Sequence, residues 1–178
     1  VDHYGFRPVG VAALLGQAGA VRALAEAGAN LTAAEGFVAS FSPLHAAARY
    51  DHIDVVRALL AAGVDTEAKP CGETALEMAL NRGHVEIVSL LAGGGARIDG
   101  EGWHRLTPLL RAVAKGGRAA MGALLAAGAN PSQAVPGGRK KKSLWDRAPQ
   151  PLPGGATALH LAACRREPEF VADLLAAG

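Results

Sequence analysis

The sequence predicts an all-α solenoid of stacked helix–turn–helix units, and three observations support this fold class. The block "LLAAGVD" at 59–65 returns several times along the chain, and a block of the type "SPLHAAA" precedes each copy. Half of the residues are apolar but only 4% are aromatic, so the core must be built from Ala, Leu and Val. Such small side chains favour helix-on-helix packing.

The two blocks recur in a fixed phase. The first block begins at positions 7, 42, 74, 107 and 157, and in every unit the closing glycine follows 21 residues later. All length variation therefore falls between units, as expected for loops that connect rigid helix pairs. Two short helices cannot bury their apolar faces alone, so neighbouring units must stack.

The first helix of each unit has a clear start signal. Ser42 suits an N-cap, where its hydroxyl would accept a backbone N–H, and Pro43 suits the first helical position. The equivalent cap residues in the later units are Thr74, Thr107 and Thr157. A helix of about two turns is expected after each of them.

The second helix is amphipathic and ends at a glycine. Val56, Leu59 and Leu60 follow the i, i+3, i+4 spacing of one apolar helix face. Gly83 marks the break between two helices, and Gly63 ends a second helix, because glycine adopts the left-handed conformation at helix ends.

This pattern resembles the ankyrin repeat, which has a period near 33, a T-P-L-H-x-A block, G-H between the helices and V-x-x-L-L-x-x-G-A-D at the end. Five units match in phase. The resemblance implies an all-α ankyrin-repeat solenoid with β-turn fingers, as a single domain over residues 1–178. The expected units are about 2–30, 31–65, 66–97, 98–130 and 152–178, with a Pro/Gly/Lys-rich insertion at about 131–151.

Several positions depart from the family pattern. Gly10, Glu77 and Leu110 replace the motif histidine, whereas Asp51 and Arg166 replace the glycine between the helices. Aspartate tolerates a left-handed backbone better than arginine does.

Four histidines fall on positions to which the resemblance assigns a structural role. His45 and His160 hold the motif position, where imidazole bonds the cap hydroxyl and nearby backbone, and His52 and His84 hold the G-H position. A metal or catalytic site needs ligands that converge on one point, whereas these residues are distributed over several units.

Motifs for catalysis are missing from the sequence. The glycine-rich stretch 93–102 lacks the G-K-[ST] ending of a phosphate-binding loop, and there is no GxSxG, HExxH or Cys–His pairing. We therefore expect no enzyme activity, no metal and no cofactor. No apolar run approaches the ~18 residues of a membrane span, so no membrane insertion is expected.

Two cysteines, Cys71 and Cys164, lie far apart without CxxC spacing, which fits a reducing compartment. We expect an intracellular, cytoplasmic protein, with the nucleus as the alternative.

Six of the eight aromatic residues fall on the face that the resemblance implies for recognition, formed by fingers and first helices. Aromatic and arginine side chains dominate binding hot spots, so this bias predicts a partner-binding surface. The alternative is that finger aromatics pack on the adjacent finger. The predicted partner-binding residues are His3, Tyr4, Phe6, Phe37, Phe41, Arg49, Tyr50, Arg82, Trp103 and His104.

The insertion carries a run of basic residues. Without these four charges the chain has 14 basic and 16 acidic residues, so its net charge of +2 comes from this run. The segment can bind an acidic partner, RNA or DNA, serve as a nuclear localisation signal, or be a solvated tract. The residues concerned are Arg139, Lys140, Lys141, Lys142 and Trp145.

We expect a non-catalytic scaffold or adaptor module that binds a protein partner through finger tips and the concave face, as part of a larger protein or assembly. Nucleic-acid or ribonucleoprotein attachment through residues 139–142 and a purely architectural spacer are the rivals. The apolar helix faces of the terminal units further predict that flanking repeats or domains of the same chain cover both ends. The residues concerned are Val9, Val11, Leu14 and Leu15 in the first unit and Val171, Leu174 and Leu175 in the fifth.

Overall fold

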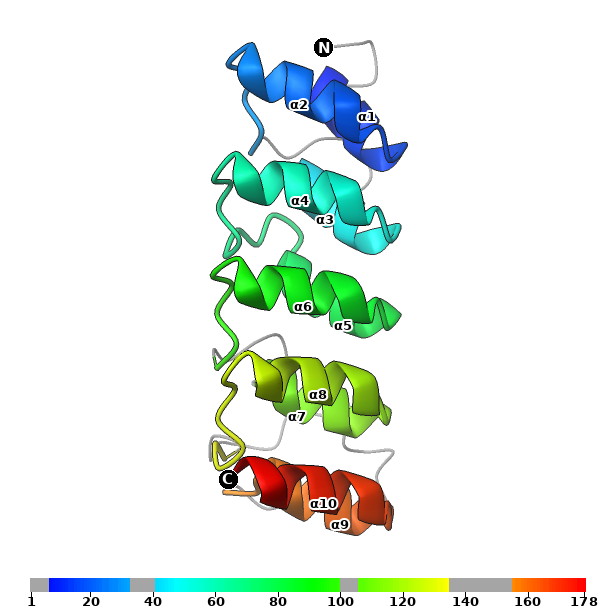
Figure 1. Ribbon diagram of the computed structural model, residues 1–178, viewed down its shortest axis with the longest axis vertical. Helices are drawn as coiled ribbons and strands as arrows, with labels where there is room; N and C mark the ends of the chain where they lie inside the picture. Colours follow the sequence, from blue (N-terminus) through cyan, green and yellow to red (C-terminus); the bar gives the residue numbers. More distant parts are fainter. Residues whose placement is uncertain (1–6, 33–40, 100–105, 135–154) are drawn as a thin grey trace. The chain divides into compact units, whose positions relative to one another are not determined.

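The structure, a computed structural model, describes residues 7–32, 41–99, 106–134 and 155–178. These residues contain ten α-helices and no strand, which confirms the all-α prediction (Figure 1). They form two compact units, one ending at Arg97 and one beginning at Ile98. The boundaries that the sequence predicts for the five repeats stay a prediction.

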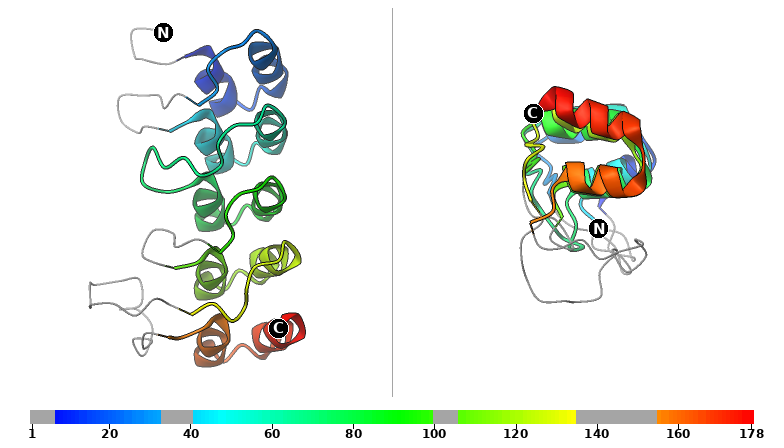
Figure 2. Two further views of the ribbon diagram at one scale, coloured as in Figure 1. Left: turned by 90° about the vertical axis from the view of Figure 1, so that its left-hand side faces the viewer. Right: turned by 90° about the horizontal axis from the view of Figure 1, so that it is seen from below.

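The first unit contains three helix pairs. Their first helices are α1 (Pro8–Leu14), α3 (Pro43–Arg49) and α5 (Ala75–Arg82), and their second helices are α2 (Ala18–Glu26), α4 (Ile53–Ala61) and α6 (Val85–Gly93). First helices pack on first helices and second helices on second helices, so the unit has two layers (Figure 2). The loop 64–73 projects on the side of the first helices.

The second unit contains two helix pairs, α7 (Pro108–Lys115) with α8 (Arg118–Ala126) and α9 (Ala158–Arg165) with α10 (Pro168–Ala177). Here α7 packs on α9, and α8 contacts α10. An ion-pair network joins the second helices, because Arg118 donates from Nε to Asp173 at 2.7 Å and also pairs with Glu169.

Small aliphatic side chains form the core, as the composition predicts. Val56 and Leu59 of α4 are fully buried, and Leu44 of α3 is 2% exposed. Phe170 of α10, the aromatic residue that the sequence places on a core-facing helical position, is also buried. Burial of each such side chain contributes about 1.5–3 kcal/mol of transfer free energy.

The residue three positions after the cap decides how the cap hydroxyl bonds. Thr74 and Glu77 form a capping box, in which Thr74 N donates to Glu77 Oε2 (2.9 Å) and Glu77 N donates to Thr74 Oγ1 (3.2 Å). Thr107 Oγ1 accepts from Leu110 N at 3.2 Å. The prediction that Ser42 accepts a backbone N–H is wrong, because its hydroxyl bonds the imidazole of the following motif histidine instead.

Every turn between the two helices of a pair has one residue with a positive φ. The five φ angles are 73° for Gly16, 61° for Asp51, 81° for Gly83, 73° for Gly116 and 57° for Arg166. A side chain with a Cβ is strained in this left-handed region. The turn geometry is therefore kept in all five repeats even where the sequence provides no glycine.

We expect Arg166→Gly to raise the free energy of unfolding by about 1 kcal/mol, because glycine removes the left-handed strain and this gain exceeds its larger unfolded-state entropy. Urea unfolding followed by circular dichroism measures the change. Asp51→Gly is the matched comparison and should gain less, since Asp51 Oδ1 lies 3.4 Å from His84 Nδ1 and this contact is lost. A lower stability of Arg166→Gly would show that the arginine side chain makes a stabilising contact.

Candidate functional site

In the first unit, a histidine from each following repeat bonds the end of the preceding first helix. His52 Nε2 lies 2.9 Å from the carbonyl oxygen of Leu14, and His84 Nε2 lies 3.3 Å from that of Arg49. A carbonyl oxygen can only accept, so Nε2 carries the hydrogen in both rings. These bonds satisfy carbonyl groups that a helix C-terminus leaves without a partner.

In the second unit an arginine takes over this role. The G-H position of the fifth repeat is Glu167, which cannot donate. Instead Arg165 donates from Nη1 to the carbonyl oxygen of Ala114 at 2.7 Å, the carbonyl equivalent to those of Leu14 and Arg49. Glu167 Oε1 holds the same guanidinium at 3.2 and 2.9 Å. The sequence pattern alone did not predict this exchange of roles.

His45 is a buried structural residue. Its Nδ1 lies 2.7 Å from Ser42 Oγ, and its Nε2 lies 2.9 Å from the carbonyl oxygen of Glu73, so Nε2 donates and Nδ1 accepts. The ring is 1% exposed, and this burial lowers its pKa because the charged imidazolium loses its hydration. His160, at the same motif position, is exposed, and its Nδ1 bonds Thr157 Oγ1 at 2.9 Å. No group of three or more His, Cys, Asp or Glu in the described ranges could hold a metal ion.

Three of the predicted partner-binding residues lie together at α3, which is the first helix of the second repeat. The guanidinium carbon of Arg49 lies 5.3 Å from the ring centroid of Phe41 and 5.8 Å from that of Tyr50. Arg49 and Phe41 are half-buried, whereas Tyr50 is 50% exposed. Arg82, a fourth predicted residue, occupies in α5 the position that Tyr50 has at the end of α3, and it is exposed.

Two leucines that sequence reasoning assigned only to a terminal apolar face extend this surface. Leu15 has the position of Tyr50 in the first repeat and is 61% exposed, and Leu14 is 38% exposed. The ring of Tyr50 stacks on that of His52 at 6.3 Å between centroids, and His52 bonds the Leu14 carbonyl, so His52 connects the ends of the two first helices. Equal spacing from the cap residue was the signal that could have found them.

We call this set the helix-end surface. It consists of Leu14, Leu15, Phe41, Arg49, Tyr50 and Arg82. Only four large hydrophobic side chains are exposed in the described part of the chain, and three of them belong to it, the fourth being Leu175. The prediction that the terminal helices expose Val9 and Leu174 is wrong, because both side chains face the core and are buried.

The remaining predicted site residues lie outside the described residues, and their roles stay predictions. They are His3, Tyr4, Phe6, Phe37, Trp103 and His104 of the expected fingers, and Arg139, Lys140, Lys141, Lys142 and Trp145 of the insertion.

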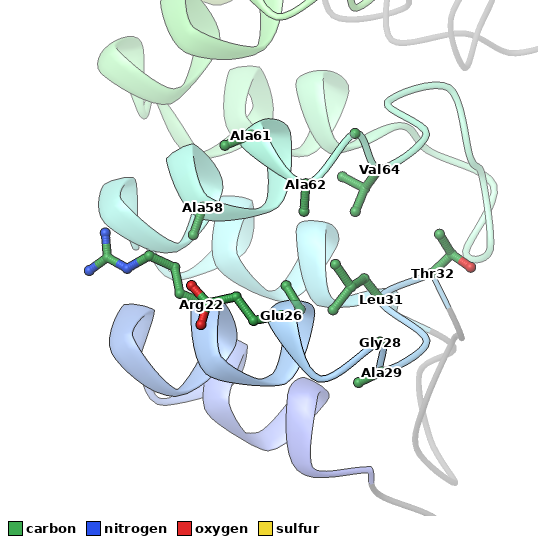
Figure 3. Close-up of a pocket in the computed structure, with 12 residues that line it drawn as sticks. Arg22, Glu26, Gly28, Ala29, Leu31, Thr32, Ala58, Ala61, Ala62 and Val64 are labelled. Carbon is green, nitrogen blue, oxygen red and sulfur yellow. The ribbon is translucent and has the colours of Figure 1, made fainter.

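A groove of about 640 Å³ lies between α2 and α4 in the first unit (Figure 3). Its walls are mostly alanine and glycine, with Arg22 and Glu26 on α2. The cause is Ala25, which stands where the next repeat has Leu60. In that repeat the leucine fills the space, since a Cβ added to Gly94 would lie 3.0 Å from the Leu60 methyl groups.

Pairs of short helices, with constant spacing inside each pair and a left-handed turn between the two helices, define a helical repeat protein. The chain matches the family model described as "Ankyrin repeats (3 copies)" over residues 1–70 and 44–134. It belongs to the ankyrin-repeat family, and the fold class predicted from the sequence is confirmed.

Two comparisons illustrate this kinship. The crystal structure of an ankyrin repeat domain from Acinetobacter baumannii AYE is similar with a TM-score of 0.77 and 30% sequence identity, over 99% of this chain and 84% of that chain. The probable E3 ubiquitin-protein ligase XBOS33 of Oryza sativa subsp. japonica is 47% identical over 51 residues, which is 28% of this chain and 10% of the rice protein. The match therefore spans a tenth of that relative.

Ankyrin repeats generally mediate protein–protein interaction, and the fold is typically non-catalytic. Across the described residues, no helix combines the length and the apolar character that a membrane crossing requires.

We expect the free energy of unfolding to fall as the pH drops below about 6.5, the usual pKa of histidine. The fall continues until the pH reaches the lowered pKa of His45 in the folded protein. In that window the unfolded chain binds a proton that the folded chain excludes, so the stabilisation is present above pH 6.5 and is lost below it. Urea unfolding at pH 7.5, 6.5 and 5.5 measures it. His45→Gln should flatten the pH profile, because glutamine does not titrate.

We expect Ala25→Leu to fill the groove and to raise the free energy of unfolding by about 1 kcal/mol through added apolar burial. Ala23→Leu, on an exposed position of the same helix, is the matched control and should change stability by less than about 0.5 kcal/mol. Equal effects of the two leucines would show that the groove is not where the added side chain packs.

Proposed function

We propose that this domain binds a protein partner through the helix-end surface. The clustering of exposed large hydrophobic side chains carries the proposal, since three of the four in the described residues lie on one surface. The core is built mainly from small side chains, and yet the large side chains of Tyr50, Leu14 and Leu15 are exposed to water. Exposed apolar groups that cluster rather than scatter mark interaction sites.

The surface also has the composition of a binding hot spot. Tyr50 offers a large amphipathic ring with few rotatable bonds, and the guanidinium carbon of Arg49 lies within 6 Å of the ring centroids of Phe41 and Tyr50. The backbone beneath is fixed by the bonds from His52 to Leu14 and from His84 to Arg49. Side chains that are ordered before binding lose less entropy when the partner docks.

The proposed role is that of a non-catalytic scaffold or adaptor. The general function of ankyrin repeats supports it, and the enzymatic activity in the name of the rice relative concerns a protein of which a tenth is matched. In the architectural alternative, the surface would contact only flanking parts of the same chain. Attachment of nucleic acid through residues 139–142 would not involve the helix-end surface.

A display selection tests the proposal. Phage that present protein fragments from the encoding organism are selected on the immobilised chain and then tested against Leu15→Ser/Tyr50→Ser. Because hot-spot truncations cost more than about 1–2 kcal/mol each, we expect bound fragments to lose at least tenfold in affinity. Leu175→Ser, which removes the exposed leucine outside the surface, should leave the binding unchanged.

Circular dichroism verifies that the double variant stays folded. Fragments that bind the wild type and the double variant equally would place recognition elsewhere on the chain. A selection that yields no fragment at all would favour the architectural alternative.

A further inference from the structure

We infer that two copies of this chain associate head to tail, with the outer face of the first repeat of one copy stacked on the outer face of the fifth repeat of the other. The contact reproduces the stacking of neighbouring repeats inside each unit. It does not use the exposed ring of Tyr50, so it goes beyond the partner binding proposed above.

The outer face of α10 is less buried than the same face of other second helices. Leu175 is 63% exposed, whereas Leu60 and Leu125 at the same repeat position are half-buried. Val171 is half-buried, whereas its equivalent Val56 is fully buried. A further repeat of the same unit follows each of these three equivalents. The outer face of α10 is therefore a face of the kind on which a helix pair stacks.

The fifth repeat also has a backbone carbonyl that no group satisfies in the described part of the chain. Leu14, Arg49 and Ala114 share one repeat position, and the carbonyl oxygen of each accepts a bond from a side chain of the next repeat. Cys164 holds this position in α9. Within the helix its oxygen would accept from residue 168, which is a proline and has no N–H. A docked repeat supplies the donor.

The first repeat has a donor in the matching place. Gln17 is the N-cap residue of α2, as His52 is of α4 and His84 is of α6. The φ and ψ angles are −82° and 72° for Gln17, −85° and 76° for His52, and −78° and 79° for His84. The Gln17 side chain is exposed and makes no cap bond. Its amide Nε2 can donate, so Gln17 of one copy bonds the Cys164 oxygen of the other.

Charges do not oppose this contact. Ion pairs join the second helices inside each unit, with 3.0 Å between Arg57 Nη2 and Glu86 Oε1 and 2.7 Å between Arg118 Nε and Asp173 Oδ2. The same repeat positions on the two outer faces hold uncharged residues, so stacking buries no unpaired charge there. These residues are Pro168 and Ala172 on the fifth repeat and Gly19 and Ala23 on the first.

The apolar side chains match as well. Leu60 points toward the next second helix, because a Cβ added to Gly94 would lie 3.0 Å from the Leu60 methyl groups. On the two outer faces these positions belong to Leu175 and Ala27, which are both exposed. The stacked fourth and fifth repeats have the same two residue types at these positions, Leu125 and Ala177.

Sedimentation velocity of the full chain tests the inference. The two faces differ, so the contact is heterologous and each dimer keeps one free copy of each face. The mass of the wild type should therefore rise with concentration beyond that of a dimer. Leu175→Ser removes apolar area from one face and Gln17→Glu removes the donor from the other, so each should weaken association about tenfold or more.

A mixture of the two variants separates a heterologous contact from any other. Leu175→Ser keeps an intact first repeat, and Gln17→Glu keeps an intact fifth repeat. Their equimolar mixture should form a dimer with the affinity of the wild-type contact, and this dimer should not grow further. Gln17→His, which introduces the donor of the second and third repeats, should associate as tightly as the wild type or more tightly.

Tyr50→Ser is the control, because it changes the helix-end surface and leaves both outer faces intact. It should associate as the wild type does, and circular dichroism verifies that every variant stays folded. A wild-type chain that remains monomeric at every concentration would overturn the inference. So would a mixture that associates no more tightly than either variant alone. Neither result touches the proposed function, since the fragment selection tests a different surface.

Discussion

At the ends of α1, α3 and α7 a backbone carbonyl has no partner within its own helix, and a side chain of the next repeat supplies the donor. In the first unit the donors are His52 and His84, and in the second unit the donor is Arg165. This bond requires the intervening turn to pass close beneath the donor. A Cβ at Gly16 would lie 2.8 Å from the His52 ring, and one at Gly116 would lie 2.7 Å from Arg165 Nη2. The left-handed turn and the bond between repeats therefore depend on each other, because the donor side chain lies where a Cβ of the turn residue would be.

Asp51 shows how the constraint is met when glycine is absent. Asp51 has a Cβ at the position of Gly16, and the bond from His84 to the Arg49 carbonyl is longer than the bond from His52 to Leu14, 3.3 Å against 2.9 Å. The Asp51 carboxylate lies 3.4 Å from the other ring nitrogen of His84. His84 thus makes a longer bond to the backbone of Arg49 and, in addition, a contact with the side chain of Asp51.

Periodicity predicted the helices, the positions of the cap residues and the left-handed turns, because these depend on residues close in sequence, but the bond of the Ser42 hydroxyl was predicted wrongly. It did not predict Arg165 as the donor to Ala114, since that bond joins residues from different repeats. Nor did it predict that Glu77 would complete a capping box at a position where the family has histidine. Of the candidate site, Phe41, Arg49 and Tyr50 were found by residue type, but their mutual contacts depend on side-chain conformations that a pattern does not contain.

The same bonds that hold the repeats together also support the candidate binding surface. His52 bonds the Leu14 carbonyl with one nitrogen and presents its ring to Tyr50. A substitution of His52 would therefore disturb the stacking of two repeats and the orientation of the exposed tyrosine at once. Tyr50 and Arg82, by contrast, make no bond between repeats among the described residues, so they can vary without loss of the fold. In the function proposed here, side chains at the ends of the first helices contact the partner, while His52 and His84 bond the backbone that carries them.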